Sequence, residues 1–223
     1  MTRRDREVDP PHRGPAAPPA TRLRADARAN RVRVLEAAEQ VFGTTGVAAS
    51  MEEIAATAGV GIGTLYRNFP TKEALLQAVH VNRLARLVAD AEELAAAPEP
   101  GEALFGFFTL MVEQSRVKRT YVAALSEAGV DDEPVRKVGL ELRHAIEGLL
   151  HRAREAGTVR PEVEIPELMA LLAGACLAAE HAGWDATLQA RTLQIIFTGL
   201  RPAPQAPGAP GGERIRPSRR ATS

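Results

Sequence analysis

Three glycines on alternate positions precede a group of side chains that could contact phosphate. The stretch AGVGIGTLYRNF, residues 58–69, contains Gly59, Gly61 and Gly63, followed by Thr64, Tyr66 and Arg67. Hydroxyl and guanidinium groups are common donors to phosphate oxygens. The stretch is therefore either a loop that folds around a nucleotide phosphate or the turn of a helix-turn-helix unit, whose second helix meets duplex DNA.

The spacing of the glycines argues against the nucleotide loop. A P-loop needs G-x-x-x-x-G-K-[ST] after a strand, and no lysine follows these glycines before Lys72. The dinucleotide fingerprint G-x-G-x-x-G also follows a strand, whereas a helical pattern precedes this stretch. The glycines instead fit a turn between two helices, with Gly59 ending the first helix and Gly61 and Gly63 leading into the second.

The elements around this turn are predicted to be helices. Apolar residues recur with a helical spacing from Val34 to Phe42, which predicts a helix from near Asp26 to Gly43–Gly46. Ser50 is expected to cap a second helix that ends at Gly59, and a third, short helix is expected over 62–68. Thr71 is expected to cap a fourth helix that runs to about Ala96.

The rest of the chain also shows helical patterns, and strand alternation of useful length is absent. Helices are predicted at about 102–118, 120–129, 133–156, 166–182 and 186–199. The predicted fold is therefore all-α. Four segments are expected: a disordered, basic, proline-rich arm over 1–22, a helix-turn-helix domain over 23–72, a larger helical domain over 73–200 and a disordered basic tail over 201–223.

Composition and charge limit the compartment and the partners. The chain has 223 residues, of which 45% are hydrophobic, and its one cysteine, Cys176, cannot form an internal disulfide. No apolar run is long enough to span a bilayer and the N-terminus lacks the apolar core of a signal peptide, so we expect a cytoplasmic protein with no membrane partner. The net charge is zero, but residues 1–33 hold nine arginines against four acids. A polyanion should therefore meet the ends of the chain and selected side chains; each end is either a solvated terminus or a binding arm.

Residues 32–79 resemble the N-terminal domain of the TetR (tetracycline repressor) family of transcriptional regulators. The matching elements are Leu35-x-x-Ala38, Phe42-x-x-x-Gly46, Ile54-Ala55-x-x-Ala58-Gly59-Val60, Thr64-Leu65-Tyr66-x-x-Phe69 and Lys72-Glu73-x-Leu75. The resemblance implies a three-helix DNA-binding domain, followed by a larger helical domain that binds a small effector and pairs with a second copy through its last two helices.

The resemblance also implies which residues meet DNA. Thr64, Tyr66 and Lys72 match DNA-contacting positions, the last two on phosphates, and Ser50 matches a position that often touches the backbone. Ile62 stands where relatives are frequently polar, so an apolar contact, for example to a thymine methyl group, becomes a hypothesis, with Arg67 sharing the base reading. The full predicted set is Ser50, Gly61, Ile62, Gly63, Thr64, Tyr66, Arg67, Asn68 and Lys72. Gly61 and Asn68 depart from the serine and histidine common in the family.

The larger domain carries weaker signals. The helix over 102–118 is apolar on more than one side, so it is either buried on several sides or lines an apolar cavity. The candidate effector residues are Phe105, Phe108, Thr109, Met111, Tyr121, Arg143 and His144. The candidate dimer residues on the last two helices are Ala170, Ala173, Gly174, Ala178, Leu193, Ile196, Phe197 and Leu200, with packing inside the domain as the alternative.

The chain is thus predicted to be a homodimeric, ligand-responsive repressor of transcription that binds a pseudo-palindromic DNA operator and is released by a small, largely apolar effector. No nucleophile–base set is evident, and His144 and His151 are seven residues apart, too far along a helix to chelate one metal alone. We therefore expect no catalysis, no metal and no cofactor. Two other classes stay open: a helical enzyme or carrier, and an adaptor that has kept the fold without acting through DNA.

Overall fold

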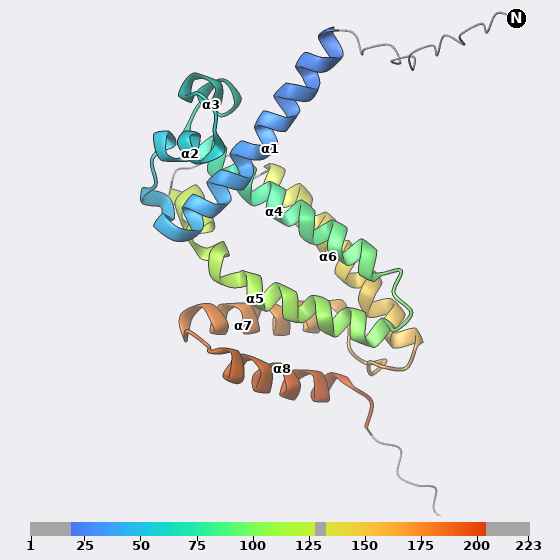
Figure 1. Ribbon diagram of the computed structural model, residues 1–223. Helices are drawn as coiled ribbons and strands as arrows, with labels where there is room; N and C mark the ends of the chain where they lie inside the picture. Colours follow the sequence, from blue (N-terminus) through green and yellow to red (C-terminus); the bar gives the residue numbers. More distant parts are fainter. Residues whose placement is uncertain (1–18, 128–132, 204–223) are drawn as a thin grey trace, which may run out of the picture. The chain divides into compact units, whose positions relative to one another are not determined.

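The computed structural model describes residues 19–127 and 133–203, with side chains described for 26–46, 48–115 and 133–203. All the regular elements of this part are helical (Figure 1), as predicted. The helices are α1 (Pro19–Thr45), the 3₁₀ turn η1 (Gly46–Ala48), α2 (Met51–Ala58), α3 (Ile62–Asn68), α4 (Lys72–Leu94), α5 (Pro100–Glu127), α6 (Glu133–Glu155), α7 (Ile165–His181) and α8 (Ala186–Leu200).

The chain forms two compact units. Of the described residues, the first contains 19–86, 117–127 and 133–139, and the second contains 87–116 and 140–203. The sequence placed a domain boundary between residues 72 and 73. In the structure the division between the two compact units falls inside α4, α5 and α6, so these three helices each contribute to both units.

The first unit is organised around a core shared by α1, α2, α3 and the start of α4. Val34, Ala38, Ile54 and Leu65 are completely buried there, and Phe42 is nearly so. The α1 residues that show helical spacing in the sequence are the ones that lie in this core. One guanidinium nitrogen of Arg86 in α4 lies 2.6 Å from each carboxylate oxygen of Glu39 in α1, and this ion pair links the two helices.

The turn between α2 and α3 has the form expected from its sequence. Gly59 has φ = 63°, in the left-handed region, and its N–H donates to carbonyls at the end of α2. The next N–H, that of Val60, donates to the carbonyl oxygen of Ala55 at 3.0 Å. The chain then becomes extended at Gly61, which precedes α3. At the start of α2, the Ser50 hydroxyl accepts the N–H of Glu53 at 3.1 Å and provides the predicted cap.

Two predicted helix boundaries were wrong. Helix α1 begins at Pro19 rather than near Asp26, so residues 19–22 of the expected disordered arm are helical. Proline is favoured in the first turn of a helix, and the alanine- and arginine-rich segment that follows has high helix propensity. The two helices expected at 102–118 and 120–129 are one continuous helix, α5. Residues 1–18 and 204–223, most of the two expected disordered ends, lie outside the described residues.

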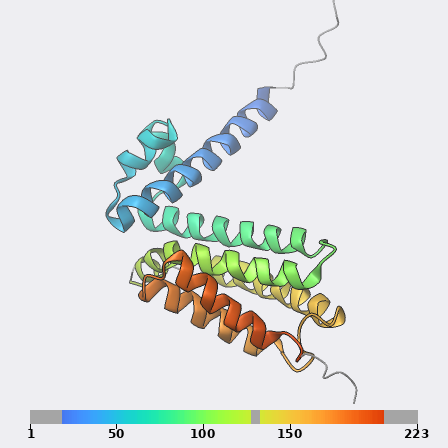
Figure 2. The ribbon, with the colours of Figure 1, turned by 60° about the horizontal axis from the view of Figure 1, so that its bottom comes forward.

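In the second unit, an aromatic group joins α5 to α8. Phe197 stacks on Phe105 with ring centroids 4.6 Å apart, and it meets Phe108 edge-on at 5.6 Å. Helices α7 and α8 lie side by side, with α7 beside α5, in both ribbon views (Figures 1 and 2). The guanidinium of Arg152 in α6 donates to the carbonyl oxygens of Ala95 and Ala97 just after α4, so α6 satisfies backbone acceptors where α4 ends.

Replacing Gly59 by alanine tests whether the left-handed turn sets the position of α3. Nothing lies within 4 Å of a Cβ at this position, so only the positive φ opposes a side chain. We expect Gly59→Ala to lower the free energy of unfolding by about 1–2 kcal/mol. Urea unfolding followed by circular dichroism measures the change.

Gly43→Ala in α1 is the matched control, because Gly43 also has open space around a built Cβ but no positive φ. This control should leave stability unchanged or raise it by up to about 1 kcal/mol. Equal effects of the two substitutions would contradict the role assigned to the turn.

Candidate nucleic-acid interface

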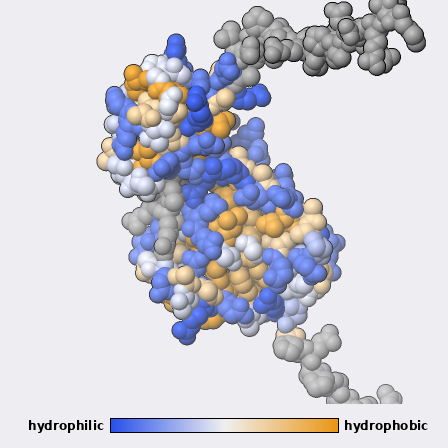
Figure 3. Space-filling model, viewed as in Figure 1, coloured by the Kyte–Doolittle hydropathy of each residue, from blue (hydrophilic) through white to orange (hydrophobic). Residues whose placement is uncertain are grey.

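Helix α3 buries one side and exposes the other. Leu65 is completely buried and Phe69, just after the helix, is 2% exposed. In the same helix, Ile62 is 39% exposed and Tyr66 is 44% exposed. The space-filling view shows apolar surface among hydrophilic surface at this helix (Figure 3). The short helix therefore presents both apolar contact and a phenolic hydroxyl to solvent.

Glycines stand on both sides of the exposed Ile62 at the start of α3. Neither Gly61 nor Gly63 has a positive φ, and a Cβ built at either position would meet nothing within 4 Å. Packing within the chain therefore does not require glycine here, in contrast to Gly59. The absence of side chains lets another molecule approach the backbone on both sides of Ile62.

Three polar side chains of α3 are organised by hydrogen bonds within the helix. The guanidinium of Arg67 donates to the hydroxyl oxygen of Thr64 at 2.9 Å. The Thr64 hydroxyl thus accepts one bond and keeps its own hydrogen for an outside acceptor. The Asn68 amide donates to the Thr64 carbonyl oxygen at 2.8 Å, so it is turned back onto its own helix and is half-buried. Arg67 and Thr64 thus form an exposed polar pair beside Tyr66.

Two further predicted residues lie at helix starts in the same unit. Ser50 is exposed, and its oxygen accepts the cap bond of α2 while its hydrogen stays available for donation. Lys72 is the first residue of α4 and is half-buried. The Thr71 hydroxyl accepts the N–H of Ala74 at 3.1 Å, which fixes the start of this helix as predicted. Hydroxyl and ammonium donors therefore accompany the exposed side of α3.

The predicted effector residues differ in their exposure in the second unit and on α6. Phe105 and Phe108 are buried in the aromatic group with Phe197, and the Thr109 hydroxyl donates to the Phe105 carbonyl oxygen of its own helix. Met111 is half-buried, whereas Arg143 and His144 are exposed on α6. The side chain of Tyr121 lies outside the described side chains.

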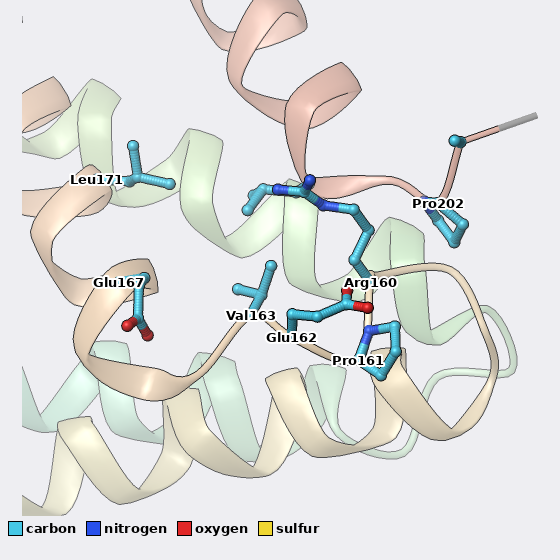
Figure 4. A pocket seen from close by; sticks show the side chains of 9 residues that line it. Arg160, Pro161, Glu162, Val163, Glu167, Leu171 and Pro202 are labelled. Carbon is cyan, nitrogen blue, oxygen red and sulfur yellow. The ribbon is translucent and has the colours of Figure 1, made fainter.

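A cleft of about 480 Å³ in the second unit is formed by other residues. It is shown in Figure 4, where Glu167 and Leu171 of α7 face Arg160 and Glu162 of the loop that precedes this helix. The rest of its lining is Pro161, Val163, Leu200, Pro202 and Ala203. The Arg160 N–H donates to the Leu200 carbonyl oxygen at 2.9 Å, so the loop before α7 is bonded to the end of α8. This cleft combines oppositely charged side chains with apolar ones, and the sequence pattern did not indicate it.

The predicted dimer residues divide into exposed and buried ones. Ala170, Ala173 and Gly174 of α7 are exposed and Ala178 is half-buried, as a contact surface requires. On α8, Leu193, Phe197 and Leu200 are buried inside their own unit and Ile196 is half-buried. Those three side chains are buried within the unit, in line with the alternative interpretation, and their part in a dimer contact stays a prediction.

The exposed large apolar side chains of these two helices were missed by the sequence analysis. They are Leu171 and Leu177 of α7 and Leu188 and Ile195 of α8, exposed by 40–73%. Leu188 and Ile195 are seven residues apart and share one side of α8. The seven-residue spacing was a detectable signal, but the buried set on the same helix gave a denser apolar pattern and was chosen instead.

Other kinds of site have no candidate among the described residues. Within residues 19–127 and 133–203, no three histidine, cysteine or acidic side chains gather as metal ligands. None of the helices in the described part of the chain is both long and apolar enough to cross a membrane. The Cys176 thiol donates to the Met111 carbonyl oxygen at 3.7 Å, a contact within the second unit.

Comparisons with known proteins cover both units. The family model for bacterial regulatory proteins of the tetR family matches residues 34–79, and the model for the C-terminal domain of SbtR-like transcriptional regulators matches residues 99–202. The chain is 37% identical over 68 residues to the transcriptional regulator UidR of Escherichia coli K12. That match covers 30% of this chain, and within it the chain spans only 35% of the length of UidR.

Solved structures match over a larger part of the chain. The TetR transcription regulatory protein of Mycobacterium vanbaalenii is 40% identical with a TM-score of 0.68, over 80% of this chain and 99% of the other. The TetR transcriptional regulator SCO0520 of Streptomyces coelicolor is 34% identical with a TM-score of 0.66, over 78% of this chain and 99% of the other. With its helix-turn-helix unit and its helical second unit both matched, the chain belongs to the TetR family of transcriptional regulators.

Proposed function

We propose that this regulator is a repressor that binds a pseudo-palindromic operator as a homodimer and is released by a small, largely apolar effector. The observation that carries the DNA part is the exposed side of α3, where Ile62, Tyr66 and the Arg67–Thr64 pair face solvent while Leu65 anchors the helix. In a helix-turn-helix protein, the second helix enters the major groove. Regulators of this family are generally not enzymes, and we propose that this chain acts in the cytoplasm without catalysis.

The donors around α3 suit phosphate positioning more than base reading. The Tyr66 and Thr64 hydroxyls, the Ser50 hydroxyl and the Lys72 ammonium group can each donate to a phosphate oxygen, which fixes register without reading sequence. Ile62 stands between two glycines, so it can approach a base edge closely and contact a thymine methyl group. Arg67 still has guanidinium donors beyond the one that binds Thr64. Base reading is thus assigned to Ile62 and Arg67.

The dimer is proposed to form through the exposed sides of α7 and α8. Ala170, Leu171, Gly174 and Leu177 line α7, and Leu188 and Ile195 line α8. Exposed apolar side chains that gather on neighbouring helices mark an interaction surface. An operator with two half-sites requires two copies of α3 about 34–36 Å apart, or at a multiple of that distance.

The effector is proposed to bind the second unit, which the family implies. Phe105, Phe108, Thr109 and Met111 of α5 remain the candidate contacts, and Phe105 and Phe108 pack there against Phe197. An effector can shift the DNA-binding equilibrium only by the difference of its affinities for the two conformations. Mass spectrometry of the protein under native conditions identifies a ligand that co-purifies, and adding that ligand to the DNA complex tests release.

Removing single phosphate donors should weaken binding to all sequences alike. We expect Tyr66→Phe to cost about 1.5 kcal/mol in DNA affinity, because one hydrogen bond to a charged acceptor is removed. Lys72→Ala should also reduce the slope of log affinity against log salt by about one, because its ammonium group no longer neutralises a phosphate. Fluorescence anisotropy with duplexes from upstream of its own gene measures both effects. Unchanged affinity in both variants would reject phosphate contact by these residues.

Changing the proposed base readers should instead alter sequence preference. Ile62→Ala and Arg67→Gln are expected to change the relative affinity for variant half-sites by about 1 kcal/mol. Competition among duplexes with a randomised half-site measures the preference, and Tyr66→Phe is the control because it should keep the wild-type ranking. If both Ile62→Ala and Arg67→Gln keep that ranking, these residues are not the readers.

A charge on the exposed side of α8 should prevent dimerisation. Ile195 is 73% exposed in the protomer, so Ile195→Glu should leave the fold intact while it places a carboxylate in the proposed apolar contact. We expect monomers in sedimentation velocity and weaker binding to the two-half-site duplex. Leu140→Glu on α6, where Leu140 is 58% exposed, is the matched control and should stay dimeric. If Ile195→Glu dimerises with the same concentration dependence as the wild type, the interface lies elsewhere.

A further inference from the structure

The first half of α1 is a basic helix that extends beyond the core of its unit. The matched DNA-binding family model begins at residue 34, whereas α1 begins at Pro19, so fifteen helical residues precede the matched region. Arg28, Arg31 and Arg33 of this segment are all exposed. Figures 1 and 2 both show it extending past α2 and α3, and the space-filling view in Figure 3 shows mainly hydrophilic surface on its described part.

These three arginines do not surround the helix evenly. Arg28 and Arg31 precede Leu35 by seven and four residues. At 100° per residue, both positions lie within about 40° of the direction of Leu35, which is buried in the core with α2 and α3. The Arg28–Arg31 pair therefore continues the edge of α1 that packs against the DNA-binding unit. Arg33 lies about 160° away from Leu35, on the opposite side of the helix.

A cation–π contact fixes which part of the unit this pair approaches. The guanidinium of Arg31 lies over the ring of Phe69, 4.6 Å from its centroid, and Phe69 directly follows α3. Arg28 is about one helical turn farther from the core on the same side. The Arg28–Arg31 pair thus begins at the end of α3 and leads outward from it.

We propose that Arg28 and Arg31 contact the phosphate backbone of DNA that α3 holds and extend the interface beyond the matched family domain. This proposal rests on the proposed DNA-binding role of α3. DNA phosphate is the partner whose charge complements this pair. Residues 34–96 hold eight acids against four basic residues, so the two arginines supply positive charge that the rest of this domain lacks. A helix supported by tertiary packing at only one end is marginal in water, and phosphate contacts would stabilise it.

The test compares Arg28→Gln with Arg33→Gln, which remove the same charge from opposite sides of the same helix. Affinity for a duplex from upstream of its own gene is measured by anisotropy between roughly 50 and 200 mM salt. Removing one phosphate contact should lower the magnitude of the slope of log affinity against log salt by about 0.9. Between these two salt concentrations, the variant should therefore lose roughly threefold less affinity than the wild type loses. We expect this change in Arg28→Gln but not in Arg33→Gln, and Arg28→Lys should retain most of the wild-type slope.

The outcomes separate this proposal from the function on which it rests. Equal slopes for Arg28→Gln and the wild type would overturn the contact, and so would equal reductions in both glutamine variants, which would reveal a general charge effect. Both arginines are exposed, so circular dichroism should show unchanged folding. If the wild type and Tyr66→Phe bind this duplex and an unrelated duplex equally weakly, the DNA-binding proposal itself fails, whatever Arg28 does.

Discussion

The burial of Leu65 and Phe69 is the constraint on which the DNA-binding side of the structure depends. Helix α3 has seven residues and is far too short to be stable in water by itself. Its position comes from the completely buried Leu65 within it and the nearly buried Phe69 after it. Beside these two buried side chains, Ile62 and Tyr66 remain 39% and 44% exposed. The same packing that stabilises the short helix thus selects the side that can meet DNA.

The glycines of this region serve two different physical needs. Gly59 has a left-handed backbone that ends α2, so its role is conformational. Gly61 and Gly63 have neither a positive φ nor a close neighbour, and a glycine inside a helix, as Gly63 is, costs about 0.5–1 kcal/mol relative to alanine. A helix that gives up stability without an internal packing reason is consistent with close approach by an outside molecule. The stability of α3 therefore depends all the more on its buried residues and on the turn that precedes it.

The sequence was sufficient for features set by local chemistry and insufficient for features set by tertiary packing. The caps at Ser50 and Thr71 and the turn at Gly59 depend on side chains or backbone preferences a few residues away, and the structure has all three. The start of α1 was misplaced because charged residues there were interpreted as disorder, although alanine and arginine favour a helix. On α8, both the buried and the exposed apolar sets have helical spacing. Periodicity alone could not show that Phe197 stacks on Phe105 and is therefore unavailable at the surface.

The way in which the chain passes between its two units limits how an effector could act on DNA binding. Helices α4, α5 and α6 each contribute residues to both units. Helix α4 begins with Lys72, a proposed phosphate donor, and the chain just after its other end is held by Arg152 of α6 through two carbonyl oxygens. A helix transmits displacement along its axis because its backbone hydrogen bonds resist local deformation. An effector that moved α6 near Arg152 would therefore act first on the backbone at the end of α4, through the two carbonyl oxygens that Arg152 holds.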